Sequence, residues 1–135
     1  SQVAEIESAD VVVYAATGGG VMAALAASRD GASVVLIEPG RHIGGMVSGG
    51  LSHTDFGDLN LLGGLAREFH HRVASHYGAR PFYWRGPEPH VAEQILSQWL
   101  DEAGVTRIFN AQIERVIMRG NVIQQMDFSN GRRFA

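Results

Sequence analysis

The chain has 135 residues, 45% of them hydrophobic, which is the size and composition of one globular domain with its own core. Its formal net charge of -3 gives no electrostatic basis for binding nucleic acid or an anionic membrane surface. Because it has no Cys and its basic residues are all Arg, the composition excludes a redox-active disulfide, a Cys-ligated metal and Lys Schiff-base chemistry.

No apolar run in the sequence is long enough to predict a membrane span. The first residues also lack the basic and apolar segments of a signal peptide. We therefore favour the cytoplasm, with the periplasm or the outside of the cell as the alternative if a signal peptide has been removed before Ser1.

The first predicted unit is a strand, a glycine-rich turn, a helix and a second strand. Asp10–Tyr14 contains three consecutive valines, which favours a parallel strand covered on both faces. The turn Ala15–Gly20 follows it. Val21–Arg29 is expected to form a helix whose alanines let it lie close to a sheet, and the second strand, Ser33–Ile37, ends at Glu38. This order is typical of a dinucleotide-binding βαβ unit.

Two parts of this unit would bind the nucleotide. Unpaired amides at the start of the helix would face a pyrophosphate, with the helix dipole favouring its negative charge. Glu38, at the carboxyl edge of the second strand, would accept hydrogen bonds from ribose hydroxyls. Its negative charge would repel a 2′-phosphate, which argues against NADP.

The glycine motif itself is degenerate. In the G-x-G-x-x-G frame that starts directly after the strand, the three glycine positions hold Ala15, Thr17 and Gly20. A positive φ at Ala15 would cost about 1 kcal/mol or somewhat more, and the Thr17 side chain would face the phosphates. A frame of Gly18, Gly20 and Ala23 also fits the letters, but we reject it because it separates the motif from the strand.

The segment after Glu38 distinguishes a flavin from a nicotinamide site. Arg41 follows Glu38 closely, and two glycine pairs follow at Gly44-Gly45 and Gly49-Gly50. Glycines at this density indicate a backbone that passes close to a large ligand. Arg41 is interpreted as a partner of the phosphates or a cap on the adenosine end, or else as a solvated loop charge.

Two more helices are expected, over Gly64–Tyr77 and His90–Ala103, each with apolar residues at helical spacing. Between them, Ala79–Pro89 reads as a loop whose aromatic residues could stack on a ring or cover the core. His70, His71 and His76 lack the spacing of a helical metal site and are interpreted as surface or hydrogen-bonded histidines, so no metal site is predicted. His42 and His53 flank the glycine-rich segment and are candidate flavin contacts.

The last third returns to strands. Thr106–Phe109 is expected to be a third parallel strand. Gln112–Met118 and Val122–Phe128 flank a turn and predict an antiparallel hairpin.

Residues 10–55 resemble the N-terminal part of FAD-dependent oxidoreductases with the glutathione-reductase-type fold. More narrowly, they resemble a bacterial family that begins DVVVYGATPGGVMAA and continues through LEPGRHIGGMVSGGL, and the likeness recurs at Gly64–Tyr77 and Glu88–Gly104. The family commonly has Gly at the Ala15 position and Pro at the Gly18 position. In the resembled fold the hairpin belongs to a small meander over the sheet, and the resemblance implies that the main chain near Ile113 meets the adenine edge, since a strand edge offers a paired donor and acceptor. The resemblance and the motifs together give these candidate FAD-binding residues: Ala15, Ala16, Thr17, Gly18, Gly19, Gly20, Glu38, Pro39, Arg41, Gly44, Gly45, Met46, Ser48 and the main chain of Ile113.

The predicted fold class is α/β, a Rossmann-like βαβ unit with a parallel sheet and a small antiparallel β-meander. Residues 1–135 are expected to be an FAD-binding domain that is truncated before its last strand and its substrate domain, with the next strand due where the chain stops at Ala135. The expected function is the FAD-binding part of a flavin-dependent oxidoreductase, which would be inactive as a fragment. The catalytic residues and the small-molecule substrate are not predicted.

Two other functions are left open. One is a non-catalytic nucleotide-binding or assembly module that acts with a partner chain, and the other is an NAD-binding domain, against which the Arg41 and Gly44-Gly45 pattern argues. A homo-oligomer and the missing remainder of the chain are both left open as partners.

Overall fold

The structure is a computed structural model that describes residues 4–51, 53–55, 57–80 and 86–135. The aromatic residues of the predicted loop, Phe82, Tyr83 and Trp84, lie outside these ranges. In chain order the elements are β1 (Ile6–Glu7), β2 (Val11–Tyr14), α1 (Gly18–Arg29), β3 (Val34–Ile37), the 3-10 helices η1 (Gly45–Val47) and η2 (Leu59–Leu61), α2 (Gly64–His76), α3 (Pro89–Glu102), β4 (Thr106–Ile108), β5 (Ile113–Arg119), β6 (Val122–Phe128) and β7 (Arg133–Phe134).

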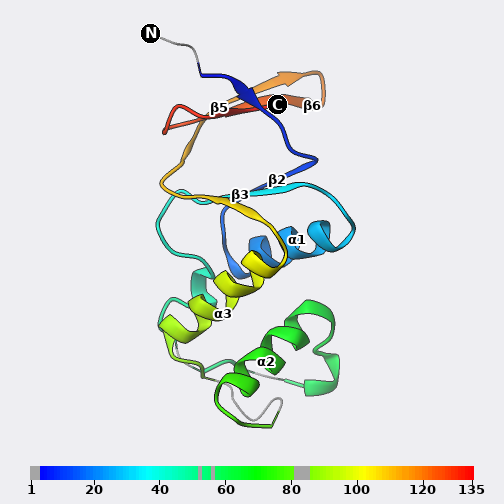
Figure 1. Cartoon of the computed structure of the whole chain (residues 1–135), viewed down its shortest axis with the longest axis vertical. Helices are drawn as coiled ribbons and strands as arrows, with labels where there is room; N and C mark the ends of the chain where they lie inside the picture. The colour runs from blue at the N-terminus through cyan, green and yellow to red at the C-terminus, as the bar shows by residue number, and fades with distance from the viewer. Residues whose placement is uncertain (1–3, 52, 56, 81–85) are drawn as a thin grey trace.

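The elements form layers (Figure 1). A parallel sheet in the order β2-β3-β4 lies at the centre, and a second sheet in the order β1-β7-β6-β5 lies above it in the view. Helices α1 and α3 pack below the parallel sheet, and α2 lies beyond them. This arrangement confirms the predicted α/β class, with its parallel sheet and its small antiparallel meander.

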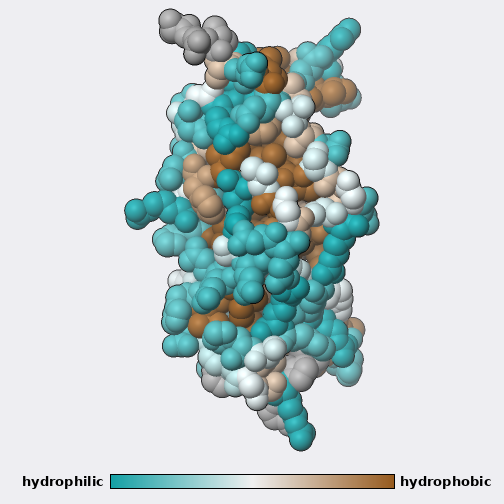
Figure 2. Space-filling model, in the orientation of Figure 1, coloured by the Kyte–Doolittle hydropathy of each residue, from teal (hydrophilic) through white to brown (hydrophobic). Residues whose placement is uncertain are grey.

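Two apolar clusters hold the layers together. The larger lies between the parallel sheet and the helices, and its fully buried members include Val21 and Leu25 of α1 and Leu96 and Leu100 of α3. The smaller fills the space between the two sheets: Ile37, Ile108, Ala111, Phe128 and Phe134. Figure 2 shows hydrophobic side chains reaching the surface of one face where the two sheets meet. Burying each large apolar side chain stabilises the fold by about 1.5–3 kcal/mol.

Parallel pairing fixes the position of the predicted nucleotide-binding residues. In the register of β2 and β3, Tyr14 lies opposite Ile37 at the carboxyl edge of the sheet. The next residues in each strand, Ala15 and Glu38, therefore emerge side by side. The Ala15 amide continues the ladder by donating to the Ile37 carbonyl at 2.7 Å.

Helix α1 begins earlier than predicted. The sequence suggested a start at Val21, but Gly18 is already helical, so residues 18–20 form the first helical turn. Thr17 caps this turn, because its backbone is extended and its Oγ1 accepts the Gly20 amide at 3.1 Å. The sequence reading missed this because it interpreted three consecutive glycines as a loop and gave Thr17 only a ligand-facing role.

Gly20 lies where α1 passes closest to the end of β2. An added Cβ at Gly20 would lie 2.0 Å from the Ala15 carbonyl oxygen, a distance that no side chain can occupy. Ala15 itself has φ 76, in the left-handed region. Ala15 and Gly20 are the first and third positions of the glycine motif that starts directly after the strand. In the structure Ala15 stands at the tight turn, and Gly20 stands at the close contact between helix and strand.

Strands β1 and β7 were not predicted at their positions. β7 spans Arg133–Phe134, where it pairs antiparallel with β6 and parallel with β1. Arg132 reinforces this pairing through a bidentate contact with Glu7, at 2.8 and 2.5 Å. Strands of two residues are too short to show an alternating pattern, so periodicity could not reveal them.

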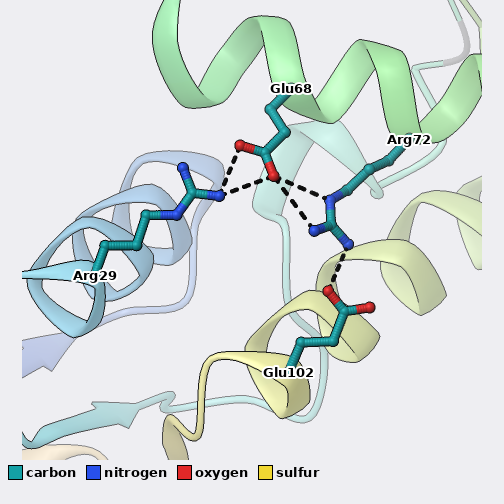
Figure 3. A network of polar contacts seen from close by, with 4 residues as sticks. All are labelled: Arg29, Glu68, Arg72 and Glu102. Carbon is teal, nitrogen blue, oxygen red and sulfur yellow. Dashed lines mark hydrogen bonds and ion pairs between the residues drawn. The ribbon is translucent and has the colours of Figure 1, made fainter.

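Helix α2 is joined to α1 and α3 by a network of charged side chains (Figure 3). Glu68 of α2 accepts from Nη2 of Arg29 of α1 at 2.8 and 2.7 Å and also from Arg72 at 3.3 and 3.4 Å. Arg72 in turn donates to Glu102 of α3 at 2.9 Å. The Arg72 guanidinium also lies 4.5 Å from the centre of the Trp99 ring, which adds a cation–π contact.

We predict that Glu68→Gln lowers the free energy of unfolding at pH 7 by about 0.5–1 kcal/mol, the range for a partly exposed ion-pair network. The hydrogen bond from Arg29 holds the pKa of Glu68 below its usual value of 4.5. A lowered pKa gives stability that is present above the unfolded-state pKa and is lost as the pH falls through the folded-state value.

The stability difference between wild type and Glu68→Gln should therefore shrink below about pH 4.5. Urea unfolding followed by circular dichroism at pH 7 and pH 3.5 measures both differences. A difference that stays constant with pH would show that the charge of Glu68 does not contribute to stability. Glu5→Gln, at an exposed position in the described part of the chain, is the control.

A second prediction concerns the contact between Gly20 and Ala15. Gly20→Ala should destabilise the chain by about 1–3 kcal/mol or more, because the new methyl group overlaps the Ala15 carbonyl. The matched control is Gly19→Ala, whose Cβ would meet only the Thr17 Oγ1, at 3.9 Å. Urea unfolding should show little change for this control, and equal losses for the two variants would contradict the steric argument.

Candidate functional site

The predicted cofactor residues gather at the carboxyl edge of the parallel sheet. The turn after β2 and the loop after β3 are joined there by main-chain contacts. Gly44 donates its amide to the Ala16 carbonyl at 2.7 Å, and Thr17 and Gly44 form an isolated parallel bridge. Segments that are far apart in the sequence therefore form one surface of backbone.

Glu38 ties the two segments together through its carboxylate. Oε2 accepts the Ala16 amide of the turn at 2.6 Å, and Oε1 accepts the Gly40 amide of its own loop at 2.9 Å. The side chain is half-buried. Since each carboxylate oxygen can accept more than one hydrogen bond, Glu38 retains capacity for hydroxyl donors from outside.

The N-terminus of α1 opens at the same place. Thr17 satisfies two amides of the first turn, those of Gly20 through its side chain and of Val21 through its carbonyl at 2.9 Å. The Gly19 amide donates to no acceptor within the described ranges, and an added Cβ there would meet only Thr17. A helix start with free amides and no side chains in the way favours an anion.

The glycines after β3 are required by close packing. Gly44 has φ 105, and an added Cβ would lie 2.4 Å from the Ser48 Oγ. Gly45 has φ 54, and an added Cβ would lie 3.4 Å from the Thr17 Cα. An added Cβ at Gly18 would lie 2.9 Å from the Val47 Cγ2, so η1 lies directly against the start of α1. The Ser48 hydroxyl stabilises this loop conformation by donating to the Ile43 carbonyl at 2.5 Å.

Pro39, Arg41 and Met46 lie on the outside of this loop. All three are exposed, with 79% of the Met46 surface accessible. Among the residues that the structure describes, Arg41 makes no ion pair. Its charge is therefore available to a ligand, although nothing in the geometry orients it.

Ile113 reaches the site only through Tyr14. It begins β5 in the other sheet, and its amide donates to the Tyr14 hydroxyl at 3.3 Å. Tyr14 ends β2, directly before the turn, and its ring packs against Phe128 with centroids 6.1 Å apart. The Ile113 amide is therefore already hydrogen-bonded to Tyr14, and adenine could bind this amide only by displacing the Tyr14 hydroxyl.

A pocket of about 440 Å³ adjoins the start of α1. Its lining is mainly apolar and comes from α1, the loop around η1, α2 and α3: Gly18, Gly19, Met22, Met46, Val47, Leu51, His53, Thr54, Ala66, Phe69, His70 and Leu96. Burial, together with electrostatic repulsion from His71, lowers the pKa of His70 and so favours its neutral form. His53, a candidate flavin contact, lines the pocket, whereas His42 is paired with Glu93 outside it.

Sequence reasoning missed Glu93 and Tyr14. Glu93 accepts the Ile43 amide at 3.0 Å, and its contact partner lies fifty residues away in the sequence, where no local pattern connects the two. Tyr14 reads as the last residue of a buried strand, and only the sheet arrangement shows its hydroxyl meeting Ile113.

No group of His, Asp and Glu in the described residues could hold a metal ion. Nor is any helix there long and apolar enough to cross a bilayer.

Solved structures share this fold. L-Amino acid deaminase from Proteus vulgaris, with its specific insertion deleted, matches with a TM-score of 0.68 at 16% identity, over 99% of this chain and 53% of that chain. A flavin monooxygenase variant from Stenotrophomonas maltophilia matches with a TM-score of 0.63 at 17% identity, over 96% of this chain and 36% of that chain. Thioredoxin reductase from Streptococcus pyogenes matches with a TM-score of 0.62 at 16% identity, over 96% of this chain and 34% of that chain.

The chain spans about half the length of the deaminase structures that it matches. At these identities the likeness shows the fold alone. A comparison with functionally curated proteins finds no match. The family model described as FAD dependent oxidoreductase matches residues 10–135. Since this match covers nearly the whole chain, the chain belongs to the FAD dependent oxidoreductase family, whose cofactor is FAD.

Proposed function

We propose that this chain is the FAD-binding part of a flavin-dependent oxidoreductase and binds the ADP half of FAD at the carboxyl edge of its parallel sheet. One observation carries the proposal: the Glu38 carboxylate, the start of α1 and the Gly44-Gly45 loop meet there, joined by contacts of 2.6 and 2.7 Å through Ala16. Each part suits a component of ADP: the start of α1 suits the pyrophosphate and Glu38 suits the ribose.

The residues present fit such a cofactor. Gly19 leaves the α1 N-terminus open to an anion, and its amide has no acceptor in the described part of the chain. Glu38 is an acceptor for ribose hydroxyls, and its charge disfavours a 2′-phosphate, which FAD lacks. Arg41 is an exposed cation on the same loop. The donors and acceptors of the site thus match pyrophosphate and ribose.

We assign the roles as follows. The amides of Gly18 and Gly19 would bind the pyrophosphate, Glu38 the ribose, and the Ile113 main chain the adenine edge. Arg41 would pair with the phosphates or cap the adenosine end. The remaining candidates would shape or line the path of the cofactor: Ala15, Ala16, Thr17, Gly20, Pro39, Gly44, Gly45, Met46 and Ser48. The apolar pocket beside Gly18 and Met46 would take the part of FAD beyond the pyrophosphate. When bound, FAD supplies hydride and electron transfer, for which the chain has no side-chain substitute such as Cys.

We further propose that the substrate-binding and catalytic groups belong to a separate domain of a longer protein. The matched deaminase structures are about twice as long as this chain, which supports this division. In this view residues 1–135 bind and orient the cofactor, and the choice of substrate is made elsewhere.

The direct test is titration of the purified chain with FAD. Binding should change the flavin fluorescence and shift the visible absorption band, because the ring would leave water for an apolar pocket. An absence of both changes at saturating FAD would remove the cofactor-binding proposal for this chain.

Glu38→Ala should weaken FAD binding by about 1–3 kcal/mol, the range for losing hydrogen bonds to a charged group. The same titration measures this loss. Glu5→Ala, at an exposed glutamate beside β1, should leave the affinity unchanged. If Glu38→Ala binds FAD as tightly as wild type, Glu38 is not the ribose ligand.

A further inference from the structure

We propose that Glu93 of α3 is a positioning residue for the cofactor-binding loop and fixes the backbone at Ile43, directly before the Gly44-Gly45 pair. The inference rests on the proposed function, since it concerns the same loop. It adds a residue from a helix that carries none of the predicted cofactor contacts.

Within the described residues, the hydrogen bonds of Glu93 all go to the loop before Gly44. Oε1 accepts the Ile43 amide at 3.0 Å, and both carboxylate oxygens lie 3.2 Å from the His42 Nδ1. The two partners differ in burial: 76% of the His42 side chain is exposed, whereas the Ile43 residue is 2% exposed. The contact with Ile43 is therefore better shielded from water than the contact with His42.

Ile43 is the point at which the loop is attached to the protein. Its side chain belongs to the main apolar cluster, together with Leu96 from the next turn of α3. The following amide, that of Gly44, donates to the Ala16 carbonyl at 2.7 Å. Glu93 thus holds one amide and the turn holds the next, so α3 and the pyrophosphate-binding turn are connected through two consecutive residues.

This anchor matters because the next two residues are glycines, whose backbone is not restricted by a side chain. Gly44 and Gly45 adopt φ values of 105 and 54, and glycine in the unbound state samples many other conformations. Holding the Ile43 amide in place removes part of that freedom before the cofactor arrives. A preorganised loop binds more tightly because less conformational entropy is lost on binding.

Three variants separate the positioning role from a general effect of charge. Glu93→Ala removes the acceptor and should weaken FAD binding about tenfold, as expected for one lost hydrogen bond to a charged group. Glu93→Gln retains an amide oxygen at the same reach and should restore affinity to within about threefold of wild type. Glu93→Asp keeps the charge but shortens the side chain, so it should resemble Glu93→Ala.

His42→Gln is the control for the exposed contact. It removes the imidazole and leaves the Ile43 hydrogen bond, so it should change FAD affinity by less than about threefold, as expected for a surface pair. A loss as large as that of Glu93→Ala would assign the effect to His42 instead and would overturn the role of the Ile43 amide.

A second measurement needs no cofactor. Amide hydrogen exchange of the free chain should be faster at Ile43 and Gly44 in Glu93→Ala, and unchanged at Val35 and Leu36 of β3. A purely structural role would instead lower the thermal stability and speed exchange throughout the sheet. Equal exchange at Ile43 and Gly44 in wild type and variant would overturn the inference.

The two readouts also separate this inference from the proposed function. If wild type binds no FAD, the proposed function fails, while the exchange rates still test the anchor. If wild type binds FAD and all three Glu93 variants bind it equally well, the positioning role fails and the proposed function stands. If Glu93→Ala does not fold, the contrast between the Gln and Asp variants decides the question.

Discussion

Parallel pairing of β2 with β3 is the constraint on which the rest of the structure depends. With Tyr14 opposite Ile37, the two strands end together, and the turn and Glu38 meet at one edge of the sheet. The Glu38 carboxylate can then accept the Ala16 amide at 2.6 Å. A shift of one residue in this register would turn Glu38 to the other face and leave the Ala16 amide without its acceptor.

The same constraint explains how a degenerate glycine motif still forms the tight turn after β2. Ala15 takes φ 76 in place of the usual glycine, at a cost of about 1–2 kcal/mol. Hydrogen bonds on both sides hold it: its own amide donates to Ile37, and the next amide donates to Glu38. Gly20 has no such freedom, because the Ala15 carbonyl occupies the space of a side chain. The motif therefore has glycine at position 20, where backbone from the end of β2 leaves no room for a side chain. At position 15 it has alanine, because hydrogen bonds on both sides stabilise the positive φ.

Local patterns were sufficient for the elements but not for their contacts. The valine runs of β2 and β3, the helical spacing of α3 and the turn between β5 and β6 predicted those elements to within about one residue. The start of α1 was missed because the cap at Thr17 is a side-chain hydrogen bond, and β1 and β7 because two residues carry no periodicity. Glu93 was missed for another reason: its hydrogen bond to Ile43 crosses from α3 to a loop fifty residues away, and no local signal encodes it.

We propose that contacts with the ADP half of FAD supply most of the binding free energy, and that the adjoining apolar pocket adds a smaller contribution from the flavin ring. Displacement of bound FAD by ADP and by FMN, followed by flavin fluorescence and equilibrium dialysis, tests it most directly. ADP should displace FAD, and FMN, which lacks the adenosine and one phosphate, should compete far more weakly. Displacement by FMN with no effect of ADP would contradict the assignment of Glu38, the α1 N-terminus and the Gly44-Gly45 loop.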